Sequence, residues 1–386
     1  MVEGLNIGIT FHWEITWKDI WKNKVAQNVY FLSKVLEKQP NVESVYFVYS
    51  DQDPLQTRYA EWLKGMKLDL RPLSDVIETT DLMIEGLWQI TPELEGLLRA
   101  HHIKVVQYQT RQTYVTDTEK FINNRTDMGS FIGTKFDAIW LLPQFMKTSH
   151  DYIEIVSRSR VYEAPLLWDE TFMDAALDPN NQLLVAQQAM TYQKYQPSGK
   201  KEKRITAIGA NLSVTETVIF PALAAEEAYN EEPSVFDHVY LINSYTRKDV
   251  ESFHHFTGYM KLLADKKLTT EGRFDTLEFI CTYTDLILGF HWADSLNYYY
   301  LDALYVGLPI VHNSPILKAG NVGYYYPSFD AYEAAHQIIR AAKYYDDELA
   351  VQEKKNKKFL HKLSPALRAN VRAYGKLLQE VMNKDK

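Results

Sequence analysis

The chain has 386 residues, more than one ordinary core accommodates, and this length predicts two domains of about 150 to 200 residues each. Hydrophobic residues make up 46% and charged residues 24%, and no run approaches the ~20 apolar residues of a membrane span, so the composition predicts a soluble globular protein. A net charge of −8 argues against a wide nucleic-acid surface, and the single cysteine, Cys281, excludes an internal disulfide.

Two further features bear on location. The N-terminus lacks the basic leader and long apolar core of a secretory signal, and a lone cysteine fits a reducing compartment, so we expect a cytoplasmic protein. Lysine-rich runs occur at residues 200–204 and 354–358. Such runs are typical of solvated surfaces, with weak contact to a membrane surface as the lesser alternative.

The first half of the chain alternates short apolar runs with helical patterns. Strands are predicted at residues 5–11, 42–49, 82–85, 103–107, 138–142 and 161–164. Helical patterns such as 25–36 and 91–101 lie between them. Because strands that alternate with helices form parallel sheets covered on both faces, residues 1–180 are expected to be one α/β domain.

A polar, turn-rich stretch predicts a linker over residues 181–204. The alternation then restarts, with strands predicted at 205–208, 238–242, 277–280, 286–290 and 309–312. Helices are predicted at 216–229, 248–263 and 297–305, which makes residues 205–345 a second α/β domain. Residues 346–386 are expected to be helical and able to pack back on the first domain, with the last helix starting at Ser364 and Pro365.

Two doubly wound, Rossmann-like halves place the carboxyl ends of their strands across a cleft, where open parallel sheets bind ligands. The strongest functional pattern, residues 291–314, belongs to the second half. Asp294 is predicted at a helix start and Asp302 about two turns later, so both carboxylates can face one pocket. Gly307 ends this helix, and the next strand carries Asn313 and Ser314 at its carboxyl end.

Each of these candidates has a structural alternative. Asp302 has apolar and aromatic neighbours, and a charge in such surroundings usually has an assigned partner. Asp294 equally suits a helix cap. His291 follows a predicted strand and could contact phosphate or acceptor, with a hydrogen-bonded structural histidine as the alternative.

The first domain carries candidate acceptor and catalytic groups. Trp13 and Trp17 lie in the loop after the first predicted strand, ahead of a helix that bears Gln27 and Asn28. These four residues suit acceptor recognition, although the tryptophans would equally form a hydrophobic lid. The candidate general bases are two residues that follow or end predicted strands, His12 and Glu85.

Several motifs resemble a little-characterised bacterial and phage family of GT-B-type glycosyltransferases. They are Gln27-Asn-Val-Tyr-Phe-Leu32, Trp140-Leu-Leu-Pro143, Glu226-Glu-Ala-Tyr229, Tyr300-Leu-Asp302-Ala-Leu and Gly323-Tyr-Tyr-Tyr-Pro. The resemblance spans nearly the whole chain. It implies a GT-B-like fold with two Rossmann-like domains facing across a cleft and C-terminal helices. It also implies glycosyl transfer without an essential metal, because helix dipoles and side chains can stabilise the departing diphosphate.

A more remote similarity links Asp294 and Asp302 to the paired glutamates of retaining GT-B enzymes, of which the first lies near the donor sugar and the second binds ribose. Such enzymes also often carry an arginine and a lysine near the start of the second domain for the diphosphate. This chain has Gly209-Ala-Asn-Leu-Ser213 there. The positive charge that binds the diphosphate would have to come from Arg247, Lys248 or Lys318, or from N–H groups near Ser213.

We therefore expect a glycosyltransferase that moves a sugar from a nucleoside diphosphate sugar to a glycan or lipid-linked saccharide, without cofactor or metal. The expected donor site comprises Asp302 at the ribose, Asp294 at the sugar, and His291, Asn297, Asn313 and Ser314. Alternatives are a phage-type DNA glycosyltransferase, a non-catalytic nucleotide-sugar or saccharide-binding protein and, less favoured, an epimerase. The sequence leaves the retaining or inverting outcome open.

Overall fold

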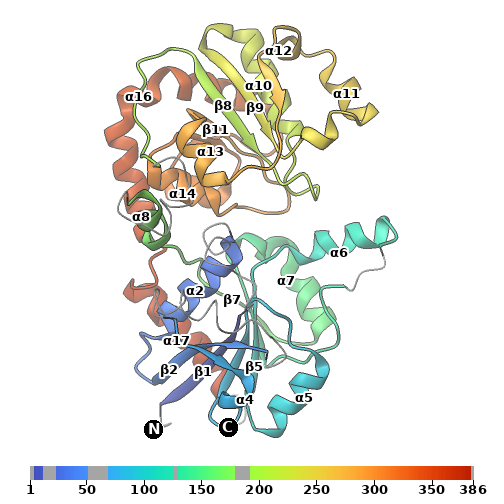
Figure 1. Ribbon diagram of the computed structural model, residues 1–386, viewed down its shortest axis with the longest axis vertical. Coiled ribbons are helices and arrows are strands. Elements are labelled where there is room, and N and C mark those ends of the chain that lie inside the picture. Colours follow the sequence, from blue (N-terminus) through green and yellow to red (C-terminus); the bar gives the residue numbers. More distant parts are fainter. Residues whose placement is uncertain (1–3, 12–22, 51–67, 126–128, 179–191, 384–386) are drawn as a thin grey trace. The chain divides into compact units, whose positions relative to one another are not determined.

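The computed structural model describes residues 4–11, 23–50, 68–125, 129–178 and 192–383. The chain forms two compact units (Figure 1). The first unit comprises residues 1–169 and 362–386, and the second comprises residues 170–361. Among the described residues, no helix combines the length and apolarity that a membrane crossing requires.

The first unit contains a seven-stranded sheet in the order β3-β2-β1-β4-β5-β6-β7, with every neighbouring pair parallel. The strands are β1 Leu5–Thr10, β2 Val42–Tyr49, β3 Leu70–Pro72, β4 Leu82–Glu85, β5 Lys104–Gln109, β6 Ala138–Leu141 and β7 Val161–Glu163. Strands β4 and β6 are buried along their whole length. Strand β6 and the first three residues of β4 are apolar runs, because a parallel sheet is covered on both faces.

The helices of this unit begin at recognisable signals. They are α2 Lys24–Leu36, α4 Leu73–Val76, α5 Pro92–Ala100, α6 Thr113–Ile122, α7 Pro143–Ser157 and α17 Arg368–Met382. The Asn23 side chain accepts hydrogen bonds from the first N–H groups of α2, and Thr91 caps α5 ahead of a proline.

Helix α17 is the last element of the chain and packs against α2 of the first unit (Figure 1). Gln39 Nε2 donates to the Val371 carbonyl at 2.9 Å, and the Tyr374 hydroxyl donates to the Pro165 carbonyl at 2.8 Å. The predicted start at Ser364 is wrong. Residues 364–367 form a turn, in which the Leu367 N–H donates to the Ser364 carbonyl, and the helix begins at Arg368.

The second unit contains a six-stranded parallel sheet in the order β10-β9-β8-β11-β12-β13. The strands are β8 Lys203–Ile208, β9 Phe236–Ile242, β10 Leu268–Thr270, β11 Leu286–Leu288, β12 Ile310–His312 and β13 Tyr324–Tyr325. The helices are α8 Thr171–Leu177, α10 Ile219–Glu231, α11 Glu251–Thr257, α12 Lys261–Ala264, α13 Thr276–Thr282, α14 Tyr299–Val306, α15 Pro315–Gly320 and α16 Ala331–His361, with 3-10 turns η1 Pro233–Val235 and η2 Tyr245–Arg247. Helices α10 and α16 supply much of the core of this unit. The expected class, α/β with Rossmann-like parallel sheets, is confirmed.

Two predicted elements of this unit and the position predicted for Asp294 are wrong. Residues 277–280 form part of helix α13 and not a strand, because Asp275 accepts hydrogen bonds from two N–H groups of the first turn and starts a helix. The single helix predicted over 248–263 is divided into α11 and α12. Helix α14 begins at Tyr299, so Asp294 lies in the preceding loop and not at a helix start.

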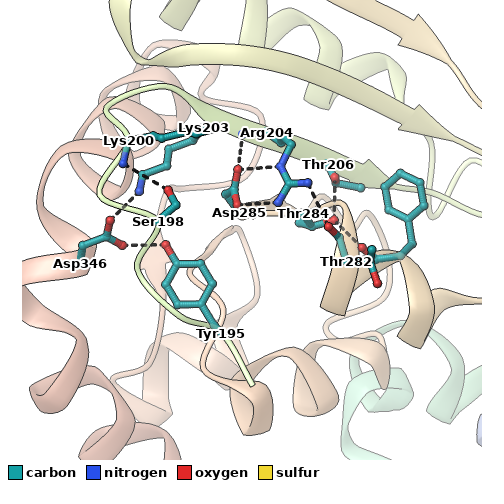
Figure 2. Close-up of polar contacts among 11 residues, drawn as sticks. Tyr195, Ser198, Lys200, Lys203, Arg204, Thr206, Thr282, Thr284, Asp285 and Asp346 are labelled. Atoms are coloured by element: carbon teal, nitrogen blue, oxygen red, sulfur yellow. Dashed lines mark hydrogen bonds and ion pairs between the residues drawn. The ribbon is translucent and has the colours of Figure 1, made fainter. Parts of the chain in front are cut away.

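A polar network fixes the entry of the chain into the second sheet (Figure 2). Lys203, the first residue of β8, is only 3% exposed, and its ammonium lies 2.6 Å from the Asp346 carboxylate of α16. The Tyr195 hydroxyl donates to the other oxygen of that carboxylate at 2.6 Å. Arg204 forms two 2.9 Å hydrogen bonds to the Asp285 carboxylate, just before β11. These contacts tie β8 to α16 and to β11.

Candidate functional site

The carboxyl ends of β8 and β11 meet at the point where the order of the second sheet reverses. Strand β8 has β9 on one side and β11 on the other, so the crossovers on its two sides leave in opposite directions. Open α/β sheets bind ligands at such a position. Two loops lie there, residues 209–218 after β8 and residues 289–298 after β11. The Trp292 N–H donates to the Thr215 carbonyl at 2.9 Å and joins them.

Each loop contributes one carboxyl group, Glu216 from the first and Asp294 from the second. The Glu216 carboxyl accepts from Asn297 Nδ2 at 2.9 Å and from the Ala210 N–H. Asp294 accepts from the Leu296 N–H at 3.1 Å. Both residues are half-buried.

Electrostatics couples these two groups. Burial and then the charge of Asp294 raise the pKa of Glu216 to about 8. Burial raises the pKa of Asp294 to about 6. Because removing a carboxylate from water disfavours its charged form, and a second carboxylate disfavours it further, the pair retains about one proton at neutral pH.

Asn211 holds the loop that carries Glu216. Its backbone is left-handed, with φ 52°, a conformation that asparagine tolerates better than most residues. Its Oδ1 accepts from the Val218 N–H at 3.0 Å, and its Nδ2 lies 3.2 Å from the carbonyls of Gly209 and Ile242. The side-chain amide of Asn211 therefore holds the loop in place through these hydrogen bonds.

The loop after β11 carries a buried histidine, His291, that packs against Tyr300 of α14. His291 is 6% exposed, and neither of its ring nitrogens has a hydrogen-bond partner among the residues that the structure describes. Its ring packs edge-on against Tyr300, with centroids 5.2 Å apart. The charges of Glu216 and Asp294 both act on Tyr300. Burial lowers the pKa of His291 to about 3, so its imidazole is neutral.

Asn313 and Ser314 position the loop after β11. Asn313 accepts from the His291 N–H at 2.9 Å and donates to the His291 carbonyl at 2.8 Å. Ser314 donates to the Ser295 carbonyl and caps helix α15 by accepting from the Leu317 N–H. Both side chains hold His291 and its neighbours in place. The backbone of Ala293 in the same loop is left-handed at φ 58°, which is costly for a residue with a Cβ.

Asp302, by contrast with Glu216 and Asp294, is a buried residue of the second unit. It is 3% exposed on α14 and faces Cys281 of α13, where burial first and the Asp302 charge second raise the pKa of the thiol to about 12. The acidic neighbour that acts on Glu216 is Asp294. Asp294 lies in the loop ahead of α14 and Asp302 on the helix itself, and the expectation that both face one pocket stays a prediction.

The predicted cations and Ser213 lie around the same sheet edge. Arg247 is exposed and donates to the Asn211 carbonyl at 3.0 Å. Lys248 and Lys318 are also exposed, and each ammonium lies 4.0 Å from the centre of a tyrosine ring. The Ser213 hydroxyl accepts from the Thr215 N–H at 3.3 Å in a local turn. Of the three cations, Arg247 is the one bonded to the loop of Glu216.

The candidates of the first unit are buried or lie outside the described residues. Gln27 and Asn28 are buried on α2, and the Tyr108 hydroxyl approaches Asn28 Oδ1 at 3.5 Å. Glu85 is 8% exposed, and its oxygens accept from the Ile90 N–H and from Gln107 Nε2, both at 2.7 Å. These bonds explain its burial without a substrate. The remaining candidates, His12, Trp13 and Trp17, lie outside the described residues.

Glu216 is the site residue that the sequence did not predict. It stands at the start of a predicted helix, where an acidic residue needs no ligand to explain it. Its role becomes visible once β8 and β11 are known to be neighbours, because this pairing brings Glu216 next to Asp294 and Asn297. Within the described part of the chain, no group of three or more His, Cys, Asp or Glu side chains is placed to hold a metal ion.

Comparison with known proteins identifies the family of the chain and the fold that it shares with solved structures. A family model described as "Protein of unknown function (DUF2827)" matches residues 7–378. No curated protein matches the chain by sequence. Among solved structures, a mutant O-GlcNAc transferase from Thermobaculum terrenum has a TM-score of 0.58 at 13% identity, over 98% of this chain and 68% of that one.

Two further structures match over nearly their whole length. A glycosyltransferase from Rickettsia africae has a TM-score of 0.56 at 12% identity, over 99% of each chain. The Anabaena protein Alr3699/HepE in complex with UDP-glucose has a TM-score of 0.52 at 10% identity, over 97% of this chain and all of the other (100%). At these identities the likeness shows the fold, which is that of GT-B glycosyltransferases.

Proposed function

We propose that this chain, which belongs to the DUF2827 family, is a glycosyltransferase that moves a sugar from a nucleoside diphosphate sugar to a hydroxyl acceptor. The observation that supports this most is the partly exposed pair of Glu216 and Asp294 at the reversal point of the second sheet. A carboxylate there can accept hydrogen bonds from sugar hydroxyls, and neighbouring loop N–H groups can receive a phosphate.

The donor is assigned to the second unit. Asp294 accepts hydrogen bonds from hydroxyl groups of the transferred sugar. We assign Asp302 to the ribose by its resemblance to the second acid of retaining enzymes. Because Asp302 is 3% exposed, this contact requires neighbouring side chains to move. The UDP-glucose in the Anabaena structure supports a nucleotide-sugar donor.

The reaction we propose needs no cofactor or metal. The bond between the sugar C1 and the diphosphate oxygen breaks, and its electron pair leaves with the diphosphate. The acceptor oxygen bonds to C1, and its proton passes to the departing diphosphate. We favour a glycan or lipid-linked saccharide as acceptor, because Trp292 and Phe329, 48% and 57% exposed, offer apolar ring faces close to the acidic pair.

A thermal-shift screen tests this proposal. We expect UDP, GDP, dTDP, CDP or one of their sugars to raise the melting temperature, because a ligand that binds only the folded state stabilises it. Asp294→Asn should lose the extra shift that the sugar gives over the bare diphosphate. Asp347→Asn, which changes an exposed acid of α16, is the matched control and should keep it.

Each other outcome has a clear meaning. The absence of a shift with every nucleotide would contradict the proposal. A shift that is accompanied by no transfer to any saccharide acceptor would instead favour a nucleotide-sugar-binding protein.

A further inference from the structure

The end of helix α16 carries a cluster of lysines that the proposed function does not use. Residues 351–362 read Val-Gln-Glu-Lys-Lys-Asn-Lys-Lys-Phe-Leu-His-Lys. This stretch holds five lysines and one glutamate, a net charge of +4 (5 − 1), in a chain whose net charge is −8. The segment is therefore strongly positive on an otherwise acidic chain.

Three of the lysines lie on one face of the helix. They are Lys354, Lys357 and Lys358, and we call them the lysine stripe. At ~100° of rotation per residue, positions 354, 357 and 358 fall within an arc of about 100°. All three residues are exposed, and His361, which is also exposed, continues the same line at the end of the helix.

The inner face of the helix fixes the direction of the lysine stripe. Phe359 is 5% exposed and packs against Gly320 of α15. Asn356 is 4% exposed, and its Nδ2 donates to the Leu304 carbonyl of α14 at 3.2 Å. Because Asn356 and Phe359 lie opposite the lysine stripe on the helix, the stripe points away from the core of the second unit.

Neighbouring side chains do not neutralise the lysine stripe. The ion pairs of α16 lie earlier in the helix, at His336, Lys343 and Asp346, and within the described part of the chain none involves a stripe lysine. Like charges three or four residues apart repel and destabilise a helix. The helix dipole favours cations only in the last turn, so it accounts for Lys358 and not for Lys354. An external anionic surface would relieve this repulsion.

An anionic lipid bilayer is the partner that fits the composition of this face. Lysine is a compact charge on a long aliphatic stem, which suits a diffuse layer of lipid phosphates above an apolar interior. Val351 lies one turn before the stripe on the same face and is 59% exposed, so it adds an aliphatic side chain. Nucleic-acid sites typically use arginine and stacked aromatic rings. Residues 351–362 contain no arginine, and their one phenylalanine is buried.

We propose that the lysine stripe docks this protein on a membrane surface that carries anionic lipid headgroups. The inference goes beyond the proposed function and is independent of the donor site. Each cation close to an anionic bilayer strengthens binding by about fivefold, so three lysines contribute about a hundredfold. The contact is peripheral and reversible, and salt weakens it because the charges are exposed. It would hold the chain at the surface where a lipid-linked acceptor lies.

Co-sedimentation of the full chain with lipid vesicles tests the inference. The vesicles consist of phosphatidylcholine alone, or of phosphatidylcholine with about one third phosphatidylglycerol as the anionic lipid. We expect binding to the anionic vesicles at low salt, little binding to the neutral ones, and loss of binding at high salt. The triple variant Lys354→Gln, Lys357→Gln, Lys358→Gln should bind the anionic vesicles about a hundredfold more weakly. Arginine at the same three positions keeps the charge and should preserve binding.

A matched control replaces three exposed lysines elsewhere in the second unit by glutamine, with the same change in net charge. They are Lys200, Lys201 and Lys266. The control should bind anionic vesicles within about threefold of wild type. An equal loss of binding in the control and the stripe variant would overturn the inference.

Three further outcomes would also overturn it. They are no binding of wild type to anionic vesicles at low salt, equal binding to both kinds of vesicle, and stripe-dependent retention of duplex DNA without vesicle binding. The last of these would identify a nucleic-acid surface instead. The melting temperature of the ligand-free stripe variant should match wild type, which shows that the variant folds. Because the test uses no nucleotide, its result does not depend on the donor site.

Discussion

The carboxyl group of Glu216, at the end of a parallel sheet and beside Asp294, makes the stability of the folded state depend on pH. Glu216 is ionised in the unfolded chain above its ordinary pKa of 4.5 but keeps its proton in the fold up to about pH 8. The folded state therefore binds more protons between these values, and its stability falls as the pH rises through this window.

This gives a prediction at the scale of one residue. Between pH 6.5 and 8, the free energy of unfolding of ligand-free wild type should fall by at most about 1.4 kcal/mol per pH unit from this group. Glu216→Gln should remove that slope and be more stable than wild type at pH 8, as measured by urea unfolding across the range. An identical slope in both proteins would show that Glu216 titrates normally in the fold.

Single residues also show what the sequence could reveal. Gly307 was correctly predicted to end a helix, and its φ of 86° is the left-handed conformation that glycine tolerates. Asp294 was singled out from the sequence as a donor-site candidate at a helix start, whereas its acidic neighbour Glu216 was not singled out. Glu216 and Asp294 are 78 positions apart (294 − 216), and only the strand order brings them together.

At the scale of elements, short apolar runs were the main source of error. Phe279 and Ile280 suit a strand and a helix equally, and the Asp275 cap decides for a helix. Strands β10 and β13, with three and two residues, were too short to give a periodic signal. Most of the other strands of both sheets were predicted, because buried parallel strands are apolar runs that alternate with helices along the chain.

The anchor between β8 and α16 gives a prediction at this scale. Asp346→Asn should destabilise the second unit by roughly 3 kcal/mol, because it leaves the buried Lys203 ammonium without its charged partner. Lys203→Met should cost less, since Asp346 keeps the Tyr195 hydroxyl and 25% of its side chain reaches solvent. Urea unfolding of both variants and of the double mutant measures this order. Equal costs, or a greater cost for Lys203→Met, would contradict it.

At the scale of the whole molecule, the chain leaves the first unit, builds the second and returns with α17. The alternation of strands and helices predicted the α/β class, and the resemblance implied the GT-B fold that the structural comparisons show. The identity of the site could not follow from periodicity. It depends on which loops adjoin at the reversal of the sheet, and that is set by topology and not by local sequence.

The central claim is that the Glu216 and Asp294 pair marks a nucleotide-sugar donor site. A crystal structure with UDP tests it most directly. We predict the nucleotide at the carboxyl ends of β8 and β11, with at least one of its atoms within hydrogen-bond distance of Glu216 or Asp294. A nucleotide bound elsewhere, with Glu216 and Asp294 touching none of its atoms, would contradict the account.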